Sequence, residues 1–302
     1  IMMRLARLEP RCGVFINSYQ SVISGYGNIY LVDIINKRIE QEHKYRSYMS
    51  NPLSFTKVED IEGFDDCILY GDYINDGRKS EIAIYQRLFY KRGWKVIYTF
   101  PMGRIKHIHT IIPCKERKCL YVLTGDSDEE SGIWEIRDCF RSVDLVIGGK
   151  QRYRTCVALP TEGGIIYATD APDEENAVWF YSFLDKKETK IENIAGPCIY
   201  GKIHNDKELF FSTSVEPDGT IKGLRSWITY KRGRGVIDNK SHIYKIDSAW
   251  NVQELFTGVK DFWPMKLFGY GTFQFSAGEG KIIVSGQAIK HFCGKSISFE
   301  DL

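Results

Sequence analysis

The sequence predicts an all-β fold, and two features of its 302 residues support that prediction. Aromatic residues are frequent, with 17 Phe, 18 Tyr and 6 Trp, and the chain also holds 27 Gly but only 9 Pro. Aromatic and β-branched side chains fit the half-buried surface of a pleated sheet, and glycine supplies the turns between strands. The second feature is a recurring order of short apolar segments separated by turn residues, with no pattern of a long helix.

The repeat is clearest in the middle of the chain. One unit predicts strands at 107–113, 119–126, 132–138 and 144–149, and the next predicts strands at 153–160, 164–170, 177–181 and 190–196. Equivalent positions are 44 or 45 residues apart, as for Asp126 and Asp170 or Trp134 and Trp179. Four short strands in each repeat of about 40 to 50 residues are typical of the blades of a β-propeller.

The same order extends toward both ends and predicts a six-bladed β-propeller of four-stranded antiparallel blades, in a single domain spanning 1–302. A strand near residues 4–8 is expected to complete the last blade. A five-bladed propeller with irregular ends is the main alternative, and a two-sheet sandwich fits less well because it needs no 44-residue step. The predicted blades span 11–48, 51–100, 105–149, 151–196, 198–258 and 262–302.

Charge and composition exclude several classes of protein. The 41 basic and 39 acidic side chains leave a formal charge of +2, which weighs against a dedicated nucleic-acid binder. No run of about 18 apolar residues predicts a membrane span. The first residues lack the apolar stretch of a secretory signal, so we expect a cytoplasmic monomer, or an extracellular protein if the N-terminus is trimmed. The eight cysteines form no CxxC pair, and whether Cys114 and Cys119 are bridged is left open.

Polar side chains recur where strands of the predicted blades begin or end. In a propeller these positions face one mouth, so we expect them to line a single site. Each single Asp is also explained as a turn-forming residue. Acidic residues follow the second strands: Asp72, Asp126 with Asp128, Asp170 with Asp173, and Glu216 with Asp218. Polar residues also begin first strands: His107, His109, Gln151, Arg152, Tyr153 and Arg154.

These residues suit carbohydrate chemistry. In an enzyme, two of the carboxylates would serve as acid and as nucleophile or base, and His107 with Tyr153 would be base and acid of a lyase. The catalytic candidates are Asp126, Asp170, His107 and Glu216, and the substrate-binding candidates are His109, Asp72, Asp128, Gln151, Arg152, Tyr153, Arg154 and Trp227. No metal or other cofactor is assigned. As alternatives, His107 and His109 would hold a divalent metal with Asp126, or would be packing residues.

An insertion at 217–240 interrupts the fifth repeat between its second and third strands. Its basic residues would clamp an acidic ligand such as a uronate, a sialate or a phosphate, because Arg offers a bidentate fork to such groups. Trp227 and Tyr230 would stack on a sugar ring. The alternative interpretation is a solvated, mobile flap. The basic residues are Lys222, Arg225, Lys231, Arg232 and Arg234.

Two segments resemble a known family. Residues 133–144 resemble a degenerate Asp-box, the turn between the third and fourth strands of sialidase-like propellers, in which Asp138 keeps the Asp position, and residues 243–250 form a second copy. The residues at 107–109, 124–126, 132–134, 153–154 and 168–172 are similar to bacterial six-bladed BNR-repeat proteins described as glycosidase-like. The resemblance implies a carbohydrate ligand, with Arg152 and Arg154 as candidates for a carboxylate clamp.

The function predicted from the sequence is therefore a carbohydrate-active or carbohydrate-binding propeller. Glycoside hydrolysis of an acidic glycan is the enzymatic version, with polysaccharide lyase chemistry less favoured. A non-catalytic propeller that binds a glycan or a partner protein on the same face is the alternative. A buried carboxylate with a raised pKa would favour the enzyme, whereas solvated carboxylates and an aromatic platform would favour binding.

Overall fold

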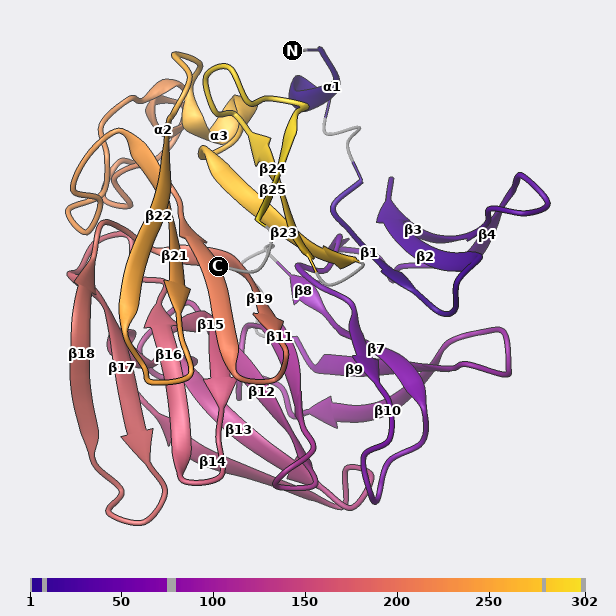
Figure 1. The fold of residues 1–302 in the computed structure, drawn as a ribbon. Coiled ribbons are helices and arrows are strands. Elements are labelled where there is room, and N and C mark those ends of the chain that lie inside the picture. Colours follow the sequence, from indigo (N-terminus) through magenta and orange to yellow (C-terminus); the bar gives the residue numbers. More distant parts are fainter. Residues whose placement is uncertain (1, 7–9, 75–79, 279–280, 300–302) are drawn as a thin grey trace. The chain divides into compact units, whose positions relative to one another are not determined.

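The computed structural model describes residues 2–6, 10–74, 80–278 and 281–299. Over these residues the chain forms five four-stranded sheets and one three-stranded sheet, each antiparallel with strands paired in chain order (Figure 1). The predicted all-β fold, a six-bladed β-propeller of four-stranded antiparallel blades, is confirmed, and the five-bladed alternative is wrong. Helices are limited to single turns of three or four residues, and no described helix has the length and apolar character needed to cross a membrane.

The chain divides into two compact units, and the first comprises residues 6–154. It contains three sheets and a short two-stranded ribbon, followed by the single turn η1 (Gln151–Tyr153). The ribbon pairs β5 (Met49–Ser50) with β8 (Tyr73–Ile74). The sheets are built from β1 (Cys12–Phe15), β2 (Gln20–Gly25), β3 (Asn28–Asp33) and β4 (Arg38–Lys44); from β6 (Thr56–Val58), β7 (Cys67–Gly71), β9 (Ile82–Leu88) and β10 (Lys95–Phe100); and from β11 (His107–Cys114), β12 (Cys119–Gly125), β13 (Gly132–Arg137) and β14 (Ser142–Gly148).

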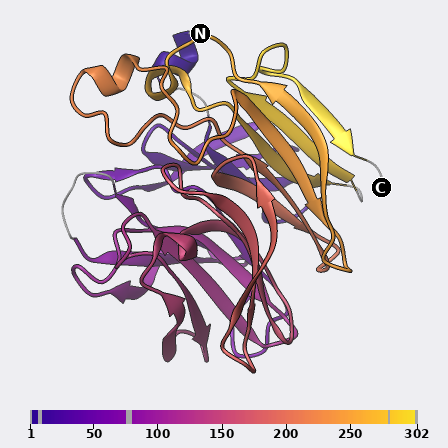
Figure 2. The ribbon, with the colours of Figure 1, turned by 90° about the vertical axis from the view of Figure 1, so that its left-hand side faces the viewer.

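The second unit comprises residues 155–302 together with residues 1–5. Its three sheets are drawn in pink, orange and yellow in Figure 2. They are built from β15 (Thr155–Pro160), β16 (Gly164–Thr169), β17 (Asn176–Ser182) and β18 (Glu188–Ile194); from β19 (Cys198–His204), β20 (Glu208–Thr213), β21 (Lys240–Ile246) and β22 (Val252–Val259); and from β23 (Thr272–Gly278), β24 (Lys281–Gln287) and β25 (Ser296–Phe299). The short helices are α1 (Met2–Leu5), α2 (Arg225–Ile228) and α3 (Met265–Phe268). The expectation of a single domain stays a prediction.

The N-terminal segment differs from its predicted structure. Residues 4 and 5 were expected to begin a strand, but Met2–Leu5 forms the helix α1, and residues 7–9 lie outside the described residues. Arg4 is buried, forms an ion pair with Asp261 at 2.7 Å, and donates from Nε to the Phe268 carbonyl at 2.7 Å. The N-terminus therefore joins the unit of the last sheet through an ion pair and a helix-end carbonyl instead of a strand ladder.

Burial falls from the inner to the outer strands of the sheets. Every residue of the second strands β7, β12 and β16 is buried, whereas the fourth strands β4, β14 and β18 are mostly half-buried or exposed. Strands buried on both faces read as continuous apolar runs, and half-exposed strands carry alternating charges. This difference explains why the second strand of each repeat is the easiest to recognise in the sequence.

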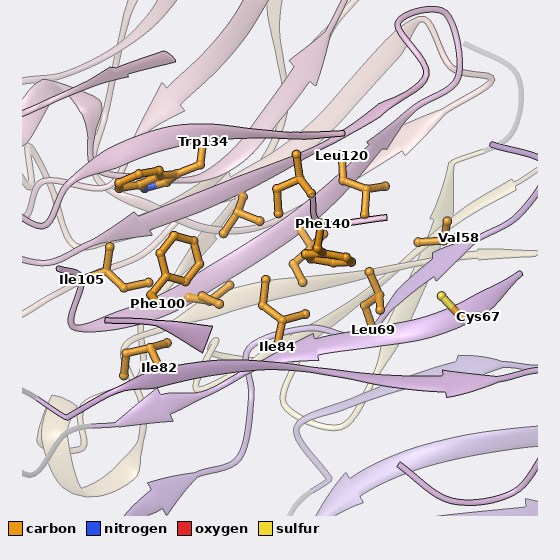
Figure 3. Packing of buried hydrophobic residues seen from close by; sticks show 14 of the residues in the cluster. Val58, Cys67, Leu69, Ile82, Ile84, Phe100, Ile105, Leu120, Trp134 and Phe140 are labelled. Carbon is orange, nitrogen blue, oxygen red and sulfur yellow. The ribbon is translucent and has the colours of Figure 1, made fainter. Parts of the chain in front are cut away.

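A hydrophobic cluster fills the space between the second and third sheets (Figure 3). Ile82 and Ile84 of β9 contribute from one sheet, and Leu120 of β12 contributes from the other. Phe100 meets the Trp134 ring edge-on, with 5.2 Å between the ring centroids. Because this core holds the two sheets together, it also fixes the position of β11, the first strand of the third sheet.

The approach of β11 to β7 requires a residue without a side chain at Gly71. A Cβ atom at this position would lie 2.5 Å from the Cβ of Ile108, far inside van der Waals contact. The backbone just beyond Gly71 also bonds to β11, because the Ile108 amide donates to the Asp72 carbonyl at 3.0 Å. Gly71 therefore sets the spacing at the end of β11 that carries His107 and His109.

We expect Gly71→Ala to destabilise the protein by about 1 to 3 kcal/mol, because the new methyl group overpacks a rigid β-branched neighbour. Gly25→Ala is the matched control, since Gly25 also ends a second strand but has no atom within 4 Å of its Cβ position. The control should change stability by less than about 0.5 kcal/mol. Urea unfolding followed by tryptophan fluorescence measures both, and equal effects would contradict the close-approach argument.

Candidate functional site

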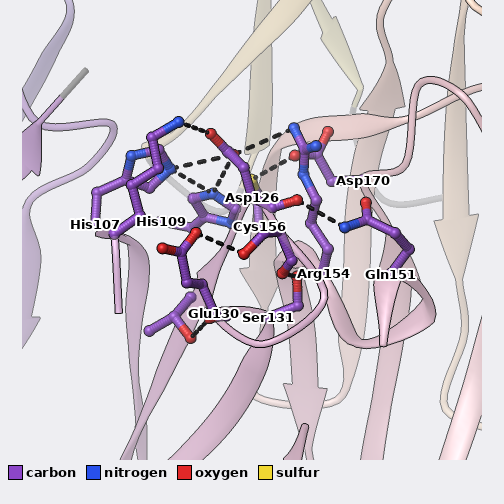
Figure 4. Close-up of polar contacts among 12 residues, drawn as sticks. His107, His109, Asp126, Glu130, Ser131, Gln151, Arg154, Cys156 and Asp170 are labelled. Carbon is purple, nitrogen blue, oxygen red and sulfur yellow. Dashed lines mark hydrogen bonds and ion pairs between the residues drawn. The ribbon is translucent and has the colours of Figure 1, made fainter. Parts of the chain in front are cut away.

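Two histidines and one aspartate meet at an end of the third sheet. His107 begins β11 and pairs with Gly125, the last residue of β12, so Asp126 lies beside the start of β11. The β11–β12 register shifts between Ile108 and Thr110, which marks a bulge next to His109. The predicted convergence of His107, His109 and Asp126 is therefore present within the first unit (Figure 4).

The polar atoms of these three side chains face one another. The two Nε2 atoms are 3.0 Å apart. Asp126 Oδ1 is 3.3 Å from His107 Nε2 and 3.6 Å from His109 Nε2. The side chains of His107 and His109 are 0% and 1% exposed, whereas that of Asp126 is 29% exposed. The group therefore combines two buried imidazoles with a carboxylate that reaches solvent.

Neighbouring residues fix the orientation of both rings. His107 Nδ1 lies 3.2 Å from the Ile74 carbonyl, and because a carbonyl only accepts, Nδ1 carries a hydrogen. The Tyr73 ring stacks on His107 with 4.1 Å between centroids. His109 packs against the backbone of Gly125, where an added Cβ would lie 2.6 Å from His109 Cε1. The ribbon β5–β8 and Gly125 thus determine how the rings point.

Two cations lie against the same carboxylate. Lys106 Nζ is 2.7 Å from Asp126 Oδ2, and an Arg154 Nη2 atom is 3.4 Å from Oδ1. Gln151 donates to the Asp126 carbonyl at 2.7 Å and holds the loop in place. Burial raises the pKa of Asp126, but hydrogen bonds from His107 and His109 outweigh it and keep that pKa well below its ordinary value. Asp126 is therefore ionised at neutral pH and is not a general acid.

Three other candidates of the first unit lie on segments next to this group along the chain. Asp128 is exposed in the loop that follows Asp126. Arg152 lies over the ring of the buried Tyr153, with 5.8 Å between its Cζ atom and the ring centroid. A role in substrate binding stays a prediction for all three.

Asp72 occupies an inner structural position. Its side chain is fully buried, pairs with Arg46 and accepts a hydrogen bond from the Ala83 amide at 2.8 Å. Its Oδ1 atom has no hydrogen-bond partner among the described residues. Burial therefore outweighs the Ala83 and Arg46 contacts and raises the pKa of Asp72 to about 6. The Arg46 contact and the burial are explained by packing, so its predicted role in substrate binding stays a prediction.

The second unit holds the other two catalytic candidates, and both are buried. Asp170 directly follows β16 and accepts a hydrogen bond from the Cys156 thiol at 3.5 Å. Glu216 follows β20 and accepts from the Ser214 hydroxyl at 2.8 Å. Burial, together with the charges of Asp170 and Glu216, raises the pKa of the Cys198 thiol far above its ordinary value. Asp170 and Glu216 thus act on one buried thiol.

The insertion between β20 and β21 presents an exposed basic and aromatic surface. It includes α2, in which Trp227 is 48% exposed, and Tyr230 beyond it is 62% exposed. Lys222, Arg225 and Arg234 are also exposed. The predicted position of the insertion, between the second and third strands of its sheet, is confirmed.

All eight cysteines are described, and all are free thiols. Cys114 and Cys119 are direct partners across the β11–β12 hairpin, and both are free thiols.

Sequence reasoning missed several residues of the site. Lys106 precedes the first strand directly, and its position beside His107 is the signal that could have found it. Tyr73 and Ile74 carried no such signal, because the two-residue ribbon that places them is too short to show a periodicity. Arg46 was missed because it meets Asp72 from 26 residues away along the chain.

No protein-family model matches the chain, and no curated protein matches it. Solved structures do resemble it. A Bacteroides thetaiotaomicron protein of unknown function has a TM-score of 0.52 and 10% identity, over 96% of this chain and 68% of that one. A protein from Agrobacterium tumefaciens described as a TolB has a TM-score of 0.52 and 13% identity, over 83% of this chain and 80% of that one.

A third similar structure is the extracellular domain of a hybrid two-component system from B. thetaiotaomicron, with a TM-score of 0.54 and 11% identity. The match covers 93% of this chain but only 32% of that one. At such low identities these structures establish the fold alone. The class defined by fold and site is thus a six-bladed β-propeller with a buried imidazole–carboxylate centre.

The raised pKa of Asp72 predicts a specific dependence of stability on pH. The folded state binds this proton more tightly than the unfolded chain, so the contribution of Asp72 is largest below about pH 4 and is lost as the pH rises through about 6. The unfolding free energy of the wild type minus that of Asp72→Asn should fall by about 2 to 3 kcal/mol between pH 4 and pH 7. Urea titrations across this range measure the difference, and a constant or rising difference would contradict the assignment.

Proposed function

We propose that this propeller binds an acidic carbohydrate. The observation that carries the proposal is the insertion surface, defined as residues 219–237, which holds five basic and no acidic residues together with exposed Trp227 and Tyr230. Arginine forks bind carboxylates in bidentate fashion, and exposed indole and phenol rings suit the apolar face of a sugar. Cations and aromatic rings on one short segment therefore match a ligand that carries a carboxylate on a sugar ring.

The charges of this surface favour an anionic ligand. Among the described residues, Arg225 and Arg234 form no ion pair, and the ion pair of Lys231 is with Asp218, at 2.8 Å, just before the segment. Local positive charge without acidic partners attracts anions and raises their rate of association. A neutral glycan would leave these cations without a partner, so the acidic class is preferred.

The base of the insertion is ordered by close packing. Its two arms meet in the bridge between Pro217 and Arg232, and the Gly233 amide donates to the Glu216 carbonyl at 3.0 Å. An added Cβ on Gly235 would lie 1.9 Å from the Glu174 carbonyl oxygen, so this arm lies directly on the neighbouring loop. The insertion is therefore a supported platform, which favours ligand binding over a solvated flap.

Hydrolysis of the bound glycan is the second candidate function. It is favoured by the burial of Asp170 and Glu216 and by the action of both charges on one thiol, since glycosidases use paired carboxylates. Incubation with uronate and sialate oligosaccharides tests this version: new reducing ends should appear with the wild type and disappear with Asp170→Asn or Glu216→Gln.

We expect the wild type to bind alginate oligosaccharides or sialyllactose and to ignore dextran, a neutral glucan. The double variant Arg225→Gln/Arg234→Gln should bind the acidic ligand about 10- to 100-fold more weakly, because two charge-assisted contacts at an exposed surface would together contribute about 1.4 to 2.8 kcal/mol. Trp227→Ala should weaken binding as well. Isothermal titration calorimetry measures these changes.

Exposed residues outside the insertion supply the matched controls. Lys186→Gln/Lys187→Gln removes two exposed cations, and Phe262→Ala removes a ring that is 73% exposed, so neither should change the affinity. Equal losses in the test and control variants would show a nonspecific charge effect. Absence of binding to every acidic glycan would overturn the proposal.

A further inference from the structure

We infer that His107 Nε2, His109 Nε2 and Asp126 Oδ1 bind one divalent transition-metal ion of the Mn²⁺ to Zn²⁺ series. The inference rests on the geometry within the first unit and is independent of the acidic-carbohydrate proposal. The three ligand atoms come from the two ends of one β-hairpin, and the two imidazoles are buried where no solvent competes for their nitrogens.

The spacing of the three atoms fits a metal ion. Their separations of 3.0, 3.3 and 3.6 Å define a triangle whose circumradius is about 1.9 Å. An ion placed slightly above the plane of this triangle therefore reaches all three atoms at about 2.0 to 2.2 Å, the bond lengths of zinc to nitrogen and oxygen. Ligand atoms on one ion are about 3.0 Å apart in octahedral and about 3.3 Å apart in tetrahedral geometry, which brackets two of the three separations.

The surroundings of the ligands are those of a metal site. A metal-binding histidine usually donates its other N–H group to a carbonyl or carboxylate, which fixes its tautomer. His107 does this with the Ile74 carbonyl, so its Nε2 atom is the ring nitrogen free to bind a metal, which would take the place of the hydrogen bond from this ring to Asp126. Lys106 occupies Asp126 Oδ2 and leaves Oδ1 facing the nitrogens. These contacts orient the donors toward a common point.

The donor set selects among metals. Two imidazoles and one carboxylate suit Mn²⁺, Fe²⁺, Co²⁺, Ni²⁺ or Zn²⁺, whereas Mg²⁺ and Ca²⁺ prefer oxygen ligands. Arg154 approaches Oδ1 at 3.4 Å, and with Lys106 it places two positive charges near the site. Three protein ligands would leave coordination positions for water or for an oxygen atom of a ligand.

Another histidine of the chain provides a matched control. His242 also contacts carboxylates, with Nδ1 2.9 Å from Glu254 and Nε2 3.1 Å from Asp238. Its two nitrogens face different carboxylates on opposite edges of the ring, so its ligand atoms do not converge. His242→Ala therefore removes an imidazole–carboxylate contact without removing a metal site.

The test is calorimetric titration of the full chain, freed of metal by chelation and dialysis, with ZnCl₂, CoCl₂, MnCl₂ and MgCl₂. We expect one Zn²⁺ or Co²⁺ per chain, negligible binding of Mg²⁺, and visible absorption bands when Co²⁺ binds. His109→Gln and Asp126→Asn should each lower Zn²⁺ affinity at least about 10-fold, because losing a residue that binds the metal costs no less than losing a residue that only hydrogen-bonds to such a ligand. His242→Ala should bind as the wild type does.

Further variants keep the result unambiguous. Gly125→Ala keeps all three ligand residues but displaces the His109 ring, so it should weaken Zn²⁺ binding while circular dichroism shows a folded protein. Arg225→Gln/Arg234→Gln should leave metal binding unchanged, which separates this inference from the carbohydrate proposal. Absence of Zn²⁺ and Co²⁺ binding by the wild type, or equal binding by the ligand variants, would overturn the inference and leave a hydrogen-bonded acid–base cluster.

Discussion

The electrostatic balance at Asp126 is the constraint on which the candidate site at the end of the third sheet depends. An ionised carboxylate beside two buried imidazoles is costly unless its oxygens are fully engaged. Lys106 takes one oxygen, and the histidines face the other. Two neighbouring residues support these contacts. Gly125 leaves room for the His109 ring against its backbone, and Gln151 donates a hydrogen bond to the Asp126 carbonyl. The residues around Asp126 therefore keep its negative charge paired with cations and hydrogen-bond donors.

Much of the fold could be predicted because the repeat is visible in its most buried strands. Second strands such as β7, β12 and β16 are continuous apolar runs, and the 44-residue step from Asp126 to Asp170, the residues that follow β12 and β16, indicates blades directly. The N-terminus was the exception. Met2–Leu5 has no β-branched residue and is held by Arg4 against Asp261, a contact across 257 residues that no local pattern reveals. The helix there depends on that long-range partner.

The site was predicted only in part, for a related reason. His107, His109 and Asp126 were found because strand alternation and hairpin ends follow from sequence alone. Asp72 follows the second strand of its sheet as Asp126 does, but its side chain is fully buried and forms an ion pair with Arg46. The register of a strand determines the position of each Cα atom, whereas the residues that contact a side chain come from segments distant in the chain. For the same reason Tyr73, placed by a two-residue ribbon, could not be inferred.

The bridge at the base of the insertion has an evolutionary consequence. The bridge between Pro217 and Arg232 pins both arms before the chain returns to β21. Substitutions between these two bridged residues therefore leave the hydrogen bonds and register of the β20–β21 pair unchanged. On the proposed function, ligand preference can diversify through substitutions in this one exposed segment, while the strands that maintain the fold remain under separate selection.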